Sequence, residues 1–223
     1  MKSDLDLGIV QITTDSPKRV RLLRKVSTIN QRLNKGRYTL VGPDKEEFKD
    51  IVNTSNDTGT IYCVYNGWEV DQGRKWRCGM HTRKEEWIAF LADDIELDEN
   101  WHAEMAIFLN NREPGQYGFR LTDENGNRHE FGEDWMQFPN RSLQLSHRPL
   151  RYDINTGWIE QSPTSYVANC VVHRDVLAMV EPFGLYKAAP DVGWSFANRQ
   201  CGFPVGFNPK ARAFHLGDRG DYR

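Results

Sequence analysis

The chain has 223 residues, of which 39% are hydrophobic and 27% are charged, and its formal net charge is -2. This composition predicts a globular chain with enough residues for one domain of good size or two small ones, and it excludes a disordered chain. The nearly balanced charge gives no overall signature of nucleic-acid binding. We find no signal peptide and no apolar run long enough to span a membrane, so we expect a soluble protein without a membrane anchor.

The four cysteines have no spacing that is typical of a structural zinc site. Cys63, Cys78, Cys170 and Cys201 include no Cys-x-x-Cys pair, and the ligand-like spacing of Cys78 and His81 has no matching second pair. Free cysteines in apolar or glycine-rich surroundings pack as small hydrophobic residues. We therefore expect a reduced, cytoplasmic protein, which for a viral protein means the cytoplasm of the host.

The first hundred residues predict alternating strands and helices. Apolar runs predict four strands, at residues 6–13, 38–41, 60–65 and 87–91. Helical spacing predicts helices between them, at residues 17–33, around Phe48 and Ile51, and at 73–84. The resulting β-α-β-α-β-α-β order implies a parallel sheet with helices on its faces.

The second half of the chain lacks this regular alternation. Its expected helices lie at residues 100–110, 174–180 and 189–200. Its expected strands lie at residues 117–121, 166–172, 203–207 and 211–215. Residues 127–165 are polar, aromatic and irregular, which is typical of a binding loop or lid. No repeat or linker divides the chain, so we predict a single domain.

An apolar run that ends in carboxylates is the most informative feature of the sequence. The predicted strand 87–91 is followed closely by Asp93, Asp94 and Glu96. A buried strand that presents acids at its C-terminal end is how α/β folds hold a metal ion or a phosphate group. Such a cluster suits a hard divalent cation such as Mg²⁺ or Mn²⁺. The alternative is a strand that ends in a solvated acidic turn.

Two further residues stand at the ends of predicted elements, where sites are commonly built. Asp191 begins a predicted helix, and His215 ends the last predicted strand. Asp94 and His215 would together make a two-ligand site for Mn²⁺ or Mg²⁺, with a substrate diphosphate completing the shell. Asp191 could then act as a general base. The alternatives are an N-cap role for Asp191 and a half-buried structural histidine at position 215.

The order of these features resembles a GT-A glycosyltransferase of the large family 2 type, from about Leu7 to His215. The segments that resemble its motifs are residues 12–15 through Arg19, Asp44, 77–79, 91–94, 169–174, 189–194 and 202–215. Ala92 stands where the family has the first Asp of Leu-Asp-Asp-Asp, and Pro190 where it has the Glu of Glu-Asp-x-x-x-Trp. The resemblance implies an α/β fold with a mostly parallel, Rossmann-like central sheet, flanking helices and a smaller acceptor-side region.

The same resemblance implies a reaction and a set of site residues. Sugar would pass from a nucleoside diphosphate sugar, with UDP-sugar as the main expectation, to an acceptor hydroxyl, with inversion and Asp191 as base. The implied metal is Mn²⁺ or Mg²⁺ on Asp94 and His215. The implied donor-binding residues are Thr13, Thr14, Asp44, Arg74, Arg77 and Asp93. The implied acceptor-binding residues are Trp158, Asn169 and Trp194. Residues 1–100 would bind the donor, residues 101–215 the acceptor, and residues 216–223 would form a tail.

The acceptor stays open among a saccharide, a protein, a lipid head group and a small molecule, with a hydroxymethylated base in DNA as a minority option. Basic residues at 18–25 and at Arg141, Arg148 and Arg151 could follow phosphates, although a charge run on a helix is usually its solvated face. Two other classes remain as alternatives. One is a non-catalytic carbohydrate- or nucleotide-binding domain. The other is a sugar nucleotidyltransferase, which needs a Gly-rich phosphate loop that residues 13–17 do not provide.

Overall fold

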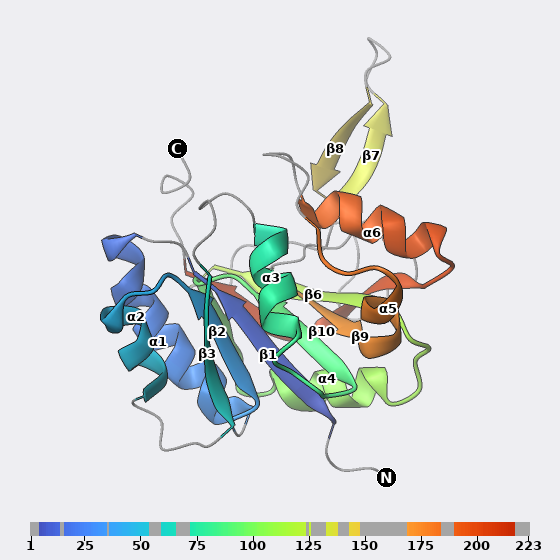
Figure 1. The fold of residues 1–223 in the computed structure, drawn as a ribbon. Helices are drawn as coiled ribbons and strands as arrows, with labels where there is room; N and C mark the ends of the chain where they lie inside the picture. The colour runs from blue at the N-terminus through green and yellow to red at the C-terminus, as the bar shows by residue number, and fades with distance from the viewer. Residues whose placement is uncertain are drawn as a thin grey trace.

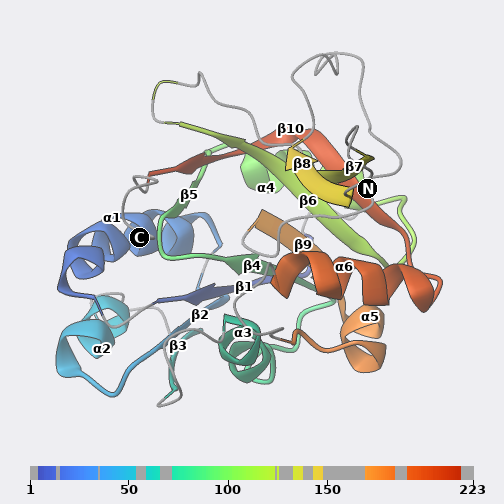
Figure 2. The same ribbon diagram turned by 90° about the horizontal axis from the view of Figure 1, so that it is seen from above.

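One large mixed sheet organises the molecule (Figure 1). The computed structural model describes residues 5–13, 16–34, 36–53, 59–65, 72–123, 125, 133–137, 143–147, 169–183 and 190–216. Within these ranges the sheet has eight strands in the order β3-β2-β1-β4-β9-β6-β10-β5, and β7 and β8 pair separately. The fold is therefore of the α/β class, with helices on both faces of the sheet, as the view from above shows (Figure 2).

The first half follows the predicted alternation. Its parallel strands are β1 (Leu7–Ile12), β2 (Tyr38–Gly42), β3 (Thr60–Val64) and β4 (Trp87–Leu91). Its helices are α1 (Pro17–Leu33), α2 (Glu46–Asn53) and α3 (Gln72–Met80). Helix α3 ends four residues earlier than predicted, because Thr82 and Arg83 turn back to donate to the carbonyls of Gly79 and Met80.

The second half extends the sheet with strands of both directions. Its strands are β5 (Ile95–Leu97), β6 (Gln116–Thr122), β9 (Asn169–His173) and β10 (Val205–His215). Its helices are α4 (Trp101–Leu109), α5 (Arg174–Met179) and α6 (Pro190–Gln200). Strand β9 runs antiparallel to both β4 and β6, whereas β10 runs parallel to β6 and antiparallel to β5.

Three strand predictions were wrong. Strand β5 was not predicted, since three residues carry too little periodic signal. Strand β10 is continuous where two strands were expected, and its register against β6 shifts between Asn208 and Arg212. Strands β7 (Glu133–Gln137) and β8 (Leu143–His147) lie in the segment predicted to be irregular.

The two faces of the sheet bury separate sets of side chains. On one face, Leu7 and Ile9 of β1 belong to a core that α1, α2 and α4 cover. On the other, Val10 and Ile12 belong to a core that α3, α5 and α6 cover. Because successive residues of a strand point to opposite faces, β1 contributes to both cores and lies in the middle layer.

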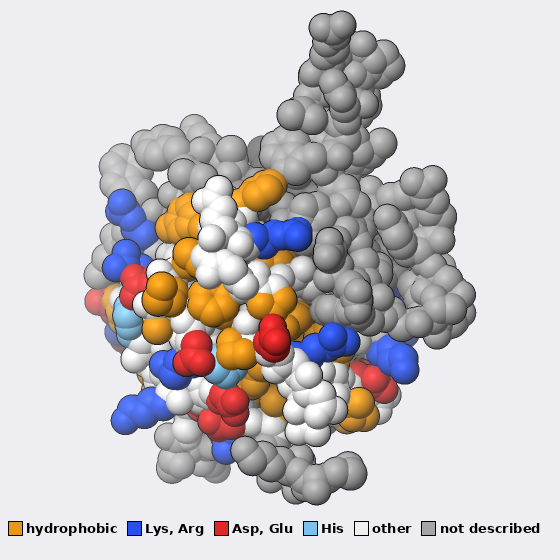
Figure 3. Space-filling model, turned by 90° about the vertical axis from the view of Figure 1, so that its right-hand side faces the viewer, with side chains coloured by type: hydrophobic (Ala, Val, Ile, Leu, Met, Phe, Trp, Pro, Cys, Tyr) orange, Lys and Arg blue, Asp and Glu red, His pale blue; other side chains and the backbone are white. Residues whose placement is uncertain are grey.

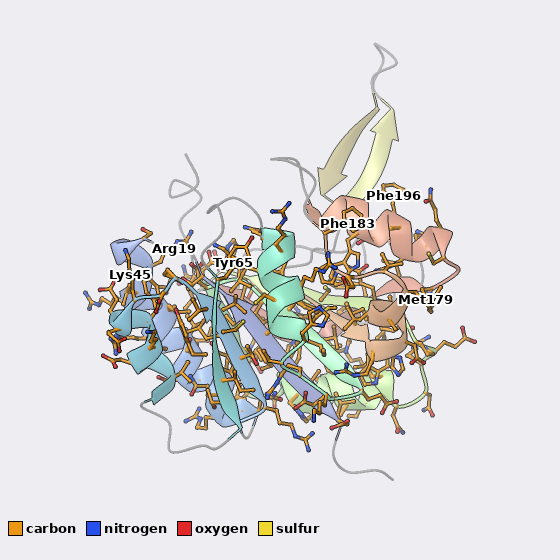
Figure 4. All side chains as sticks on the ribbon, viewed as in Figure 1. Arg19, Lys45, Tyr65, Met179, Phe183 and Phe196 are labelled. Carbon is orange, nitrogen blue, oxygen red and sulfur yellow. The ribbon has the colours of Figure 1, made fainter. Side chains whose placement is uncertain are left out.

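Apolar side chains also reach the surface on the side of α5 and α6. Figure 3 shows them in the middle of that face, among charged side chains. Met179 is 70% exposed, and Figure 4 places it with Phe183 and Phe196, toward the other side of the molecule from Arg19. None of the helices among the described residues is long and apolar enough to cross a membrane.

Gly79 allows α3 to lie close against the sheet. A Cβ atom at this position would stand 2.4 Å from Val10 Cγ1 and 2.7 Å from Val41 Cγ2. Both valines are fully buried and their branched side chains have little freedom to move away. The glycine of the segment 77–79 is thus explained by close packing between helix and strand.

We predict that Gly79→Ala lowers the thermal unfolding midpoint by several degrees. Overpacking a core costs about 1–3 kcal/mol, and a 2 kcal/mol loss lowers the midpoint of a chain of this size by about 4–8 °C. Gly202→Ala is the control, because no atom lies within 4 Å of its Cβ position and only its φ of 86° opposes the change. Strain at that φ costs Ala about 1–2 kcal/mol, so the control measures backbone strain without overpacking. An unchanged midpoint of Gly79→Ala in calorimetry would contradict this account.

Candidate functional site

The carboxylates of Asp93 and Asp94 lie in a tight turn between β4 and β5. Asp93 is 5% exposed and Asp94 is fully buried. The alternative of a solvated acidic turn is therefore wrong for these two residues. Burying two charges next to each other is costly, so the surrounding groups must compensate for them.

Arg19 of α1 provides the main compensation. Its Nη1 atom lies 3.2 Å from Asp93 Oδ1 and 2.8 Å from Asp94 Oδ2, and the guanidinium is itself buried. The Thr13 hydroxyl, just after β1, donates to Asp93 Oδ2 at 3.2 Å. Arg19 lies within the first predicted motif, but its pairing with both acids was not predicted. Helix α1 begins at Pro17, so Arg19 lies in its first turn and reaches the end of β4.

His215 reaches the same turn from the far end of the chain. Strand β10 pairs with β5 so that His215 lies opposite Ile95, and the Leu216 amide donates to the Asp94 carbonyl at 2.9 Å. This pairing places His215 Nε2 3.2 Å from Asp94 Oδ2. Two residues separated by 121 positions are thus brought together by a three-residue strand that the sequence did not reveal.

The surroundings of Asp94 keep it ionised. Burial alone raises the pKa of this carboxyl, but the hydrogen bonds and charges of His215 and Arg19 outweigh burial and lower its pKa to about 2. At neutral pH, Asp94 is therefore a carboxylate with two donors on its Oδ2 atom. Such a group can serve as a metal ligand without first losing a proton.

Asp94 and His215 fit a divalent cation as a pair of ligands. Ligand atoms about 2.0–2.2 Å from one metal and at right angles to each other are about 3 Å apart, close to the 3.2 Å observed. A carboxylate oxygen and an imidazole nitrogen suit Mn²⁺. Among the described residues, no group of three or more His, Cys, Asp or Glu side chains could hold a metal. Substrate oxygens and water would occupy the remaining coordination positions of the metal.

A second buried cation lies at the end of β1. Lys75 of α3 is 4% exposed, and its Nζ atom donates to the Thr13 carbonyl at 2.9 Å. The sequence pointed instead to its neighbours: Arg74 is exposed, and Arg77 forms an ion pair with Glu181. The helical pattern could not distinguish these three bases, because only the close packing of α3 on β1 directs Lys75 inward.

Three other residues mark the same edge of the sheet. Asp44, which follows β2, is exposed and pairs with Lys49 at 2.7 Å. Lys45 follows β2 and Tyr65 follows β3, so both lie at the same edge of the sheet as Arg19, on the same side of the view in Figure 4. The Tyr65 amide donates to the Gly42 carbonyl at 2.8 Å. Lys45 and Tyr65 were not predicted as site residues. The edge therefore carries basic and aromatic groups beside the acids.

Trp194, which we predicted to stack against an acceptor, packs inside the protein. It is fully buried, its ring packs edge-on against Phe90 with centroids 5.4 Å apart, and its Nε1 donates to the Val180 carbonyl at 2.9 Å. Since Phe90 belongs to β4, this contact holds α6 over the strand that carries the acids. The ring of Trp194 therefore packs inside the protein in this structure, and the acceptor contact predicted for it stays a prediction.

The remaining predicted residues are placed only in part. Asp191 is the second residue of α6, and Asn169 lies opposite Leu91 in the β4–β9 pair. The side chains of both lie outside the described part of the structure, as do Thr14 and Trp158 altogether. The backbone nevertheless places both Asp191 and Asn169 on elements that contact β4.

Known structures share the fold of this chain. GalNAc-T7, solved with UDP, GalNAc and Mn²⁺, matches 97% of this chain with a TM-score of 0.67 at 14% identity. The structure of S. aureus TarS matches 98% of this chain with a TM-score of 0.65 at 11% identity, and that of TarS 1–349 with UDP-GlcNAc matches 97% with a TM-score of 0.64 at 11% identity. This chain has the GT-A glycosyltransferase fold. It covers 45%, 38% and 60% of those chains. No family model and no curated protein matches it in sequence.

In this GT-A chain, we predict that Arg19→Met destabilises the fold by about 3–5 kcal/mol at pH 7, because it leaves buried carboxylates without their guanidinium. Without Arg19 the folded-state pKa of Asp94 rises from about 2. The difference in unfolding free energy between the wild type and Arg19→Met should therefore shrink as the pH falls through that raised pKa. It should vanish once Asp94 is protonated in both folded proteins. Urea titrations between pH 7 and pH 3 measure how the difference shrinks, since wild-type Asp94 becomes protonated only near pH 2.

Arg24→Met is the matched control for this substitution. Arg24 lies on the same helix, but it is exposed, and among the described residues its side chain donates to the Glu47 carbonyl. We expect the control to cost under about 1 kcal/mol at every pH. A pH-independent loss in Arg19→Met would show that the charge pairing is not what stabilises the turn.

Proposed function

We propose that the protein is a metal-dependent glycosyltransferase that uses a nucleoside diphosphate sugar, with UDP as the nucleotide. The observation that carries the proposal is the convergence of Asp94, His215, Asp93 and Arg19 at the end of β4 in a GT-A fold. The structures of GalNAc-T7 and TarS, which contain UDP or UDP-GlcNAc, support the choice of donor.

Each group at this edge has a chemical role in the proposal. Asp93, held by Thr13 and Arg19, would accept hydrogen bonds from the nucleoside, while Lys75 supplies positive charge beside Thr13 for the diphosphate. Asp94 and His215 would hold Mn²⁺ or Mg²⁺, which neutralises charge on a leaving diphosphate. Lys75 thus takes precedence over Arg74 and Arg77, which we predicted from the sequence to bind the diphosphate, since Arg77 forms an ion pair with Glu181.

Asp191 would accept the proton of the acceptor hydroxyl as that oxygen attacks the anomeric carbon, which gives inversion. Its place supports this role, because Trp194, one helical turn later, packs on β4 next to the acids. Residues 1–100 would then form the donor half and residues 101–215 the acceptor half, with Asn169 and Trp158 as acceptor contacts.

We favour a saccharide acceptor over modified DNA. The basic residues on α1 are partly bound by the protein itself: Arg24 donates to the Glu47 carbonyl and Lys25 pairs with Glu96 at 3.4 Å. A donor panel with mixed saccharides and hydroxymethylated DNA, with Mn²⁺ or a chelator present, separates these acceptors. UDP release without transfer to any acceptor would point to the wrong acceptor class. Binding without any release of UDP would favour a non-catalytic binding domain.

We expect UDP to bind more tightly with Mn²⁺ than with a chelator, and Asp94→Asn to remove that difference. Losing one charged ligand should weaken Mn²⁺-dependent binding by at least about tenfold, as measured by calorimetry. Asp98→Asn is the control, because Asp98 is also a largely buried acid with an arginine partner, Arg212, but lies after β5. Equal binding by wild type and Asp94→Asn would remove Asp94 from the site.

We expect Asp191→Asn to lose transfer activity by about 10²-fold or more while UDP affinity stays within about twofold, because a general base acts only on the acceptor. Rates of UDP-sugar turnover with an acceptor and calorimetric UDP binding test this. Asp175→Asn is the control, since Asp175 is an exposed acid in the first turn of the neighbouring helix α5. Normal transfer by Asp191→Asn would show that another group takes the proton.

A further inference from the structure

A chain of buried polar side chains lies beneath the turn that carries the two acids. Gln11 of β1, Ser27 and Asn30 of α1, and Tyr38 of β2 are all fully buried. Each is an unusual choice for an interior that Leu or Val would fill at lower cost. The first question is therefore which groups these side chains hold in place.

Gln11 and Asn30 bind the backbone on both sides of Asp93 and Asp94. Gln11 Nε2 donates to the Ala92 carbonyl at 2.7 Å, just before the acids. Asn30 Nδ2 donates to the Ile95 carbonyl at 2.9 Å, just after them. Asn30 Oδ1 also accepts from the Leu97 amide at 3.0 Å, which makes two bonds from one side chain to β5.

The hydrogen bonds among these buried polar side chains have a defined direction. Tyr38 donates its single hydroxyl proton to Gln11 Oε1 at 2.6 Å, so the Ser27 hydroxyl must donate to Tyr38, at 2.8 Å. Gln11 Oε1 also accepts from Asn30 Nδ2 at 3.3 Å. With its oxygen occupied by two donors, Gln11 can only turn its amide nitrogen to Ala92. The series of hydrogen bonds from Ser27 through Tyr38 to Gln11 therefore ends at the backbone of the turn that carries Asp93 and Asp94.

Helix α1 also supplies the charge partner of the acids. Arg19 and Asn30 are eleven residues apart, which is about three helical turns, so they lie on one face of α1. Arg19 binds the two carboxylates, and Asn30 binds the strand that follows them. One face of one helix therefore contacts both the side chains and the backbone of this turn.

We infer that Gln11 and Asn30 are positioning residues, which hold the backbone around Asp93 and Asp94 so that the carboxylates meet a nucleoside diphosphate and its metal ion. This inference rests on the proposed function, because it assigns a purpose to the geometry of that same site. Tyr38 and Ser27 act through Gln11. Their effect on the acids should therefore decrease with the number of hydrogen bonds that separate each of them from Gln11.

Asn30→Asp tests the inference with little change in side-chain volume. It replaces the Nδ2 donor by an oxygen that faces the Ile95 carbonyl and Gln11 Oε1. Asn34→Asp is a closely matched control on the same helix: Asn34 is buried, and its Nδ2 also donates to two acceptors, the carbonyls of Leu7 and Arg37, but these lie at the opposite end of β1.

We expect Asn30→Asp to weaken Mn²⁺-dependent UDP binding by at least about tenfold, and Asn34→Asp by less than about twofold, although both lower the thermal midpoint. Tyr38→Phe, which keeps the ring volume, should weaken binding by a smaller factor, and Ser27→Ala by less again. Equal effects of Asn30→Asp and Asn34→Asp on UDP binding, at similar thermal midpoints, would overturn the inference.

Hydrogen exchange separates this inference from the proposed function. If Asn30 positions the turn, Asn30→Asp should speed exchange at residues 92–97, and Asn34→Asp should not. A wild-type protein that binds no UDP would refute the proposed function, whereas the exchange comparison would still decide whether Asn30 holds the turn. Unchanged exchange at residues 92–97 in Asn30→Asp would overturn the positioning role whatever the protein binds.

Discussion

The pairing of one buried guanidinium with two adjacent buried carboxylates is the interaction on which this site depends. Two adjacent buried carboxylates are costly unless cations and hydrogen-bond donors compensate them, and Arg19 lies within 3.2 Å of both Asp93 and Asp94. This requirement constrains the fold around it. Helix α1 must begin directly after β1, so that its first turn meets the end of β4, and β5 must return toward β10 to bring His215 to the same oxygen.

Ala92 shows how the turn tolerates the loss of an acid that the family motif contains. Its contribution here is its backbone carbonyl, which accepts from Gln11 at 2.7 Å. The neighbouring carboxylates already share one guanidinium, and a third acid at this half-buried position would add repulsion. The substitution therefore fits a turn in which polar backbone contacts, and not additional charge, determine where Asp93 and Asp94 lie.

The sequence predicted the frame of the molecule better than its contacts. Apolar runs located β1, β2 and β4, and helical spacing located α1, because those elements are largely buried. The same patterns could not reveal β5, since its three residues pair with a strand more than a hundred positions away. They also could not distinguish Lys75 from Arg74, or show that Trp194 packs on Phe90. Periodicity indicates which face of an element is buried, but not which residues that face contacts.

The charges at this edge give a physical reason for a metal ion. The carboxylates of Asp93 and Asp94 carry two negative charges, and Arg19 and Lys75 formally balance them. A nucleoside diphosphate would bring at least two further negative charges to a buried, nearly neutral site, where unpaired charge is costly. A divalent cation on Asp94 and His215 would restore the balance. Metal dependence would then follow from the electrostatics of donor binding itself, before any bond to the sugar breaks.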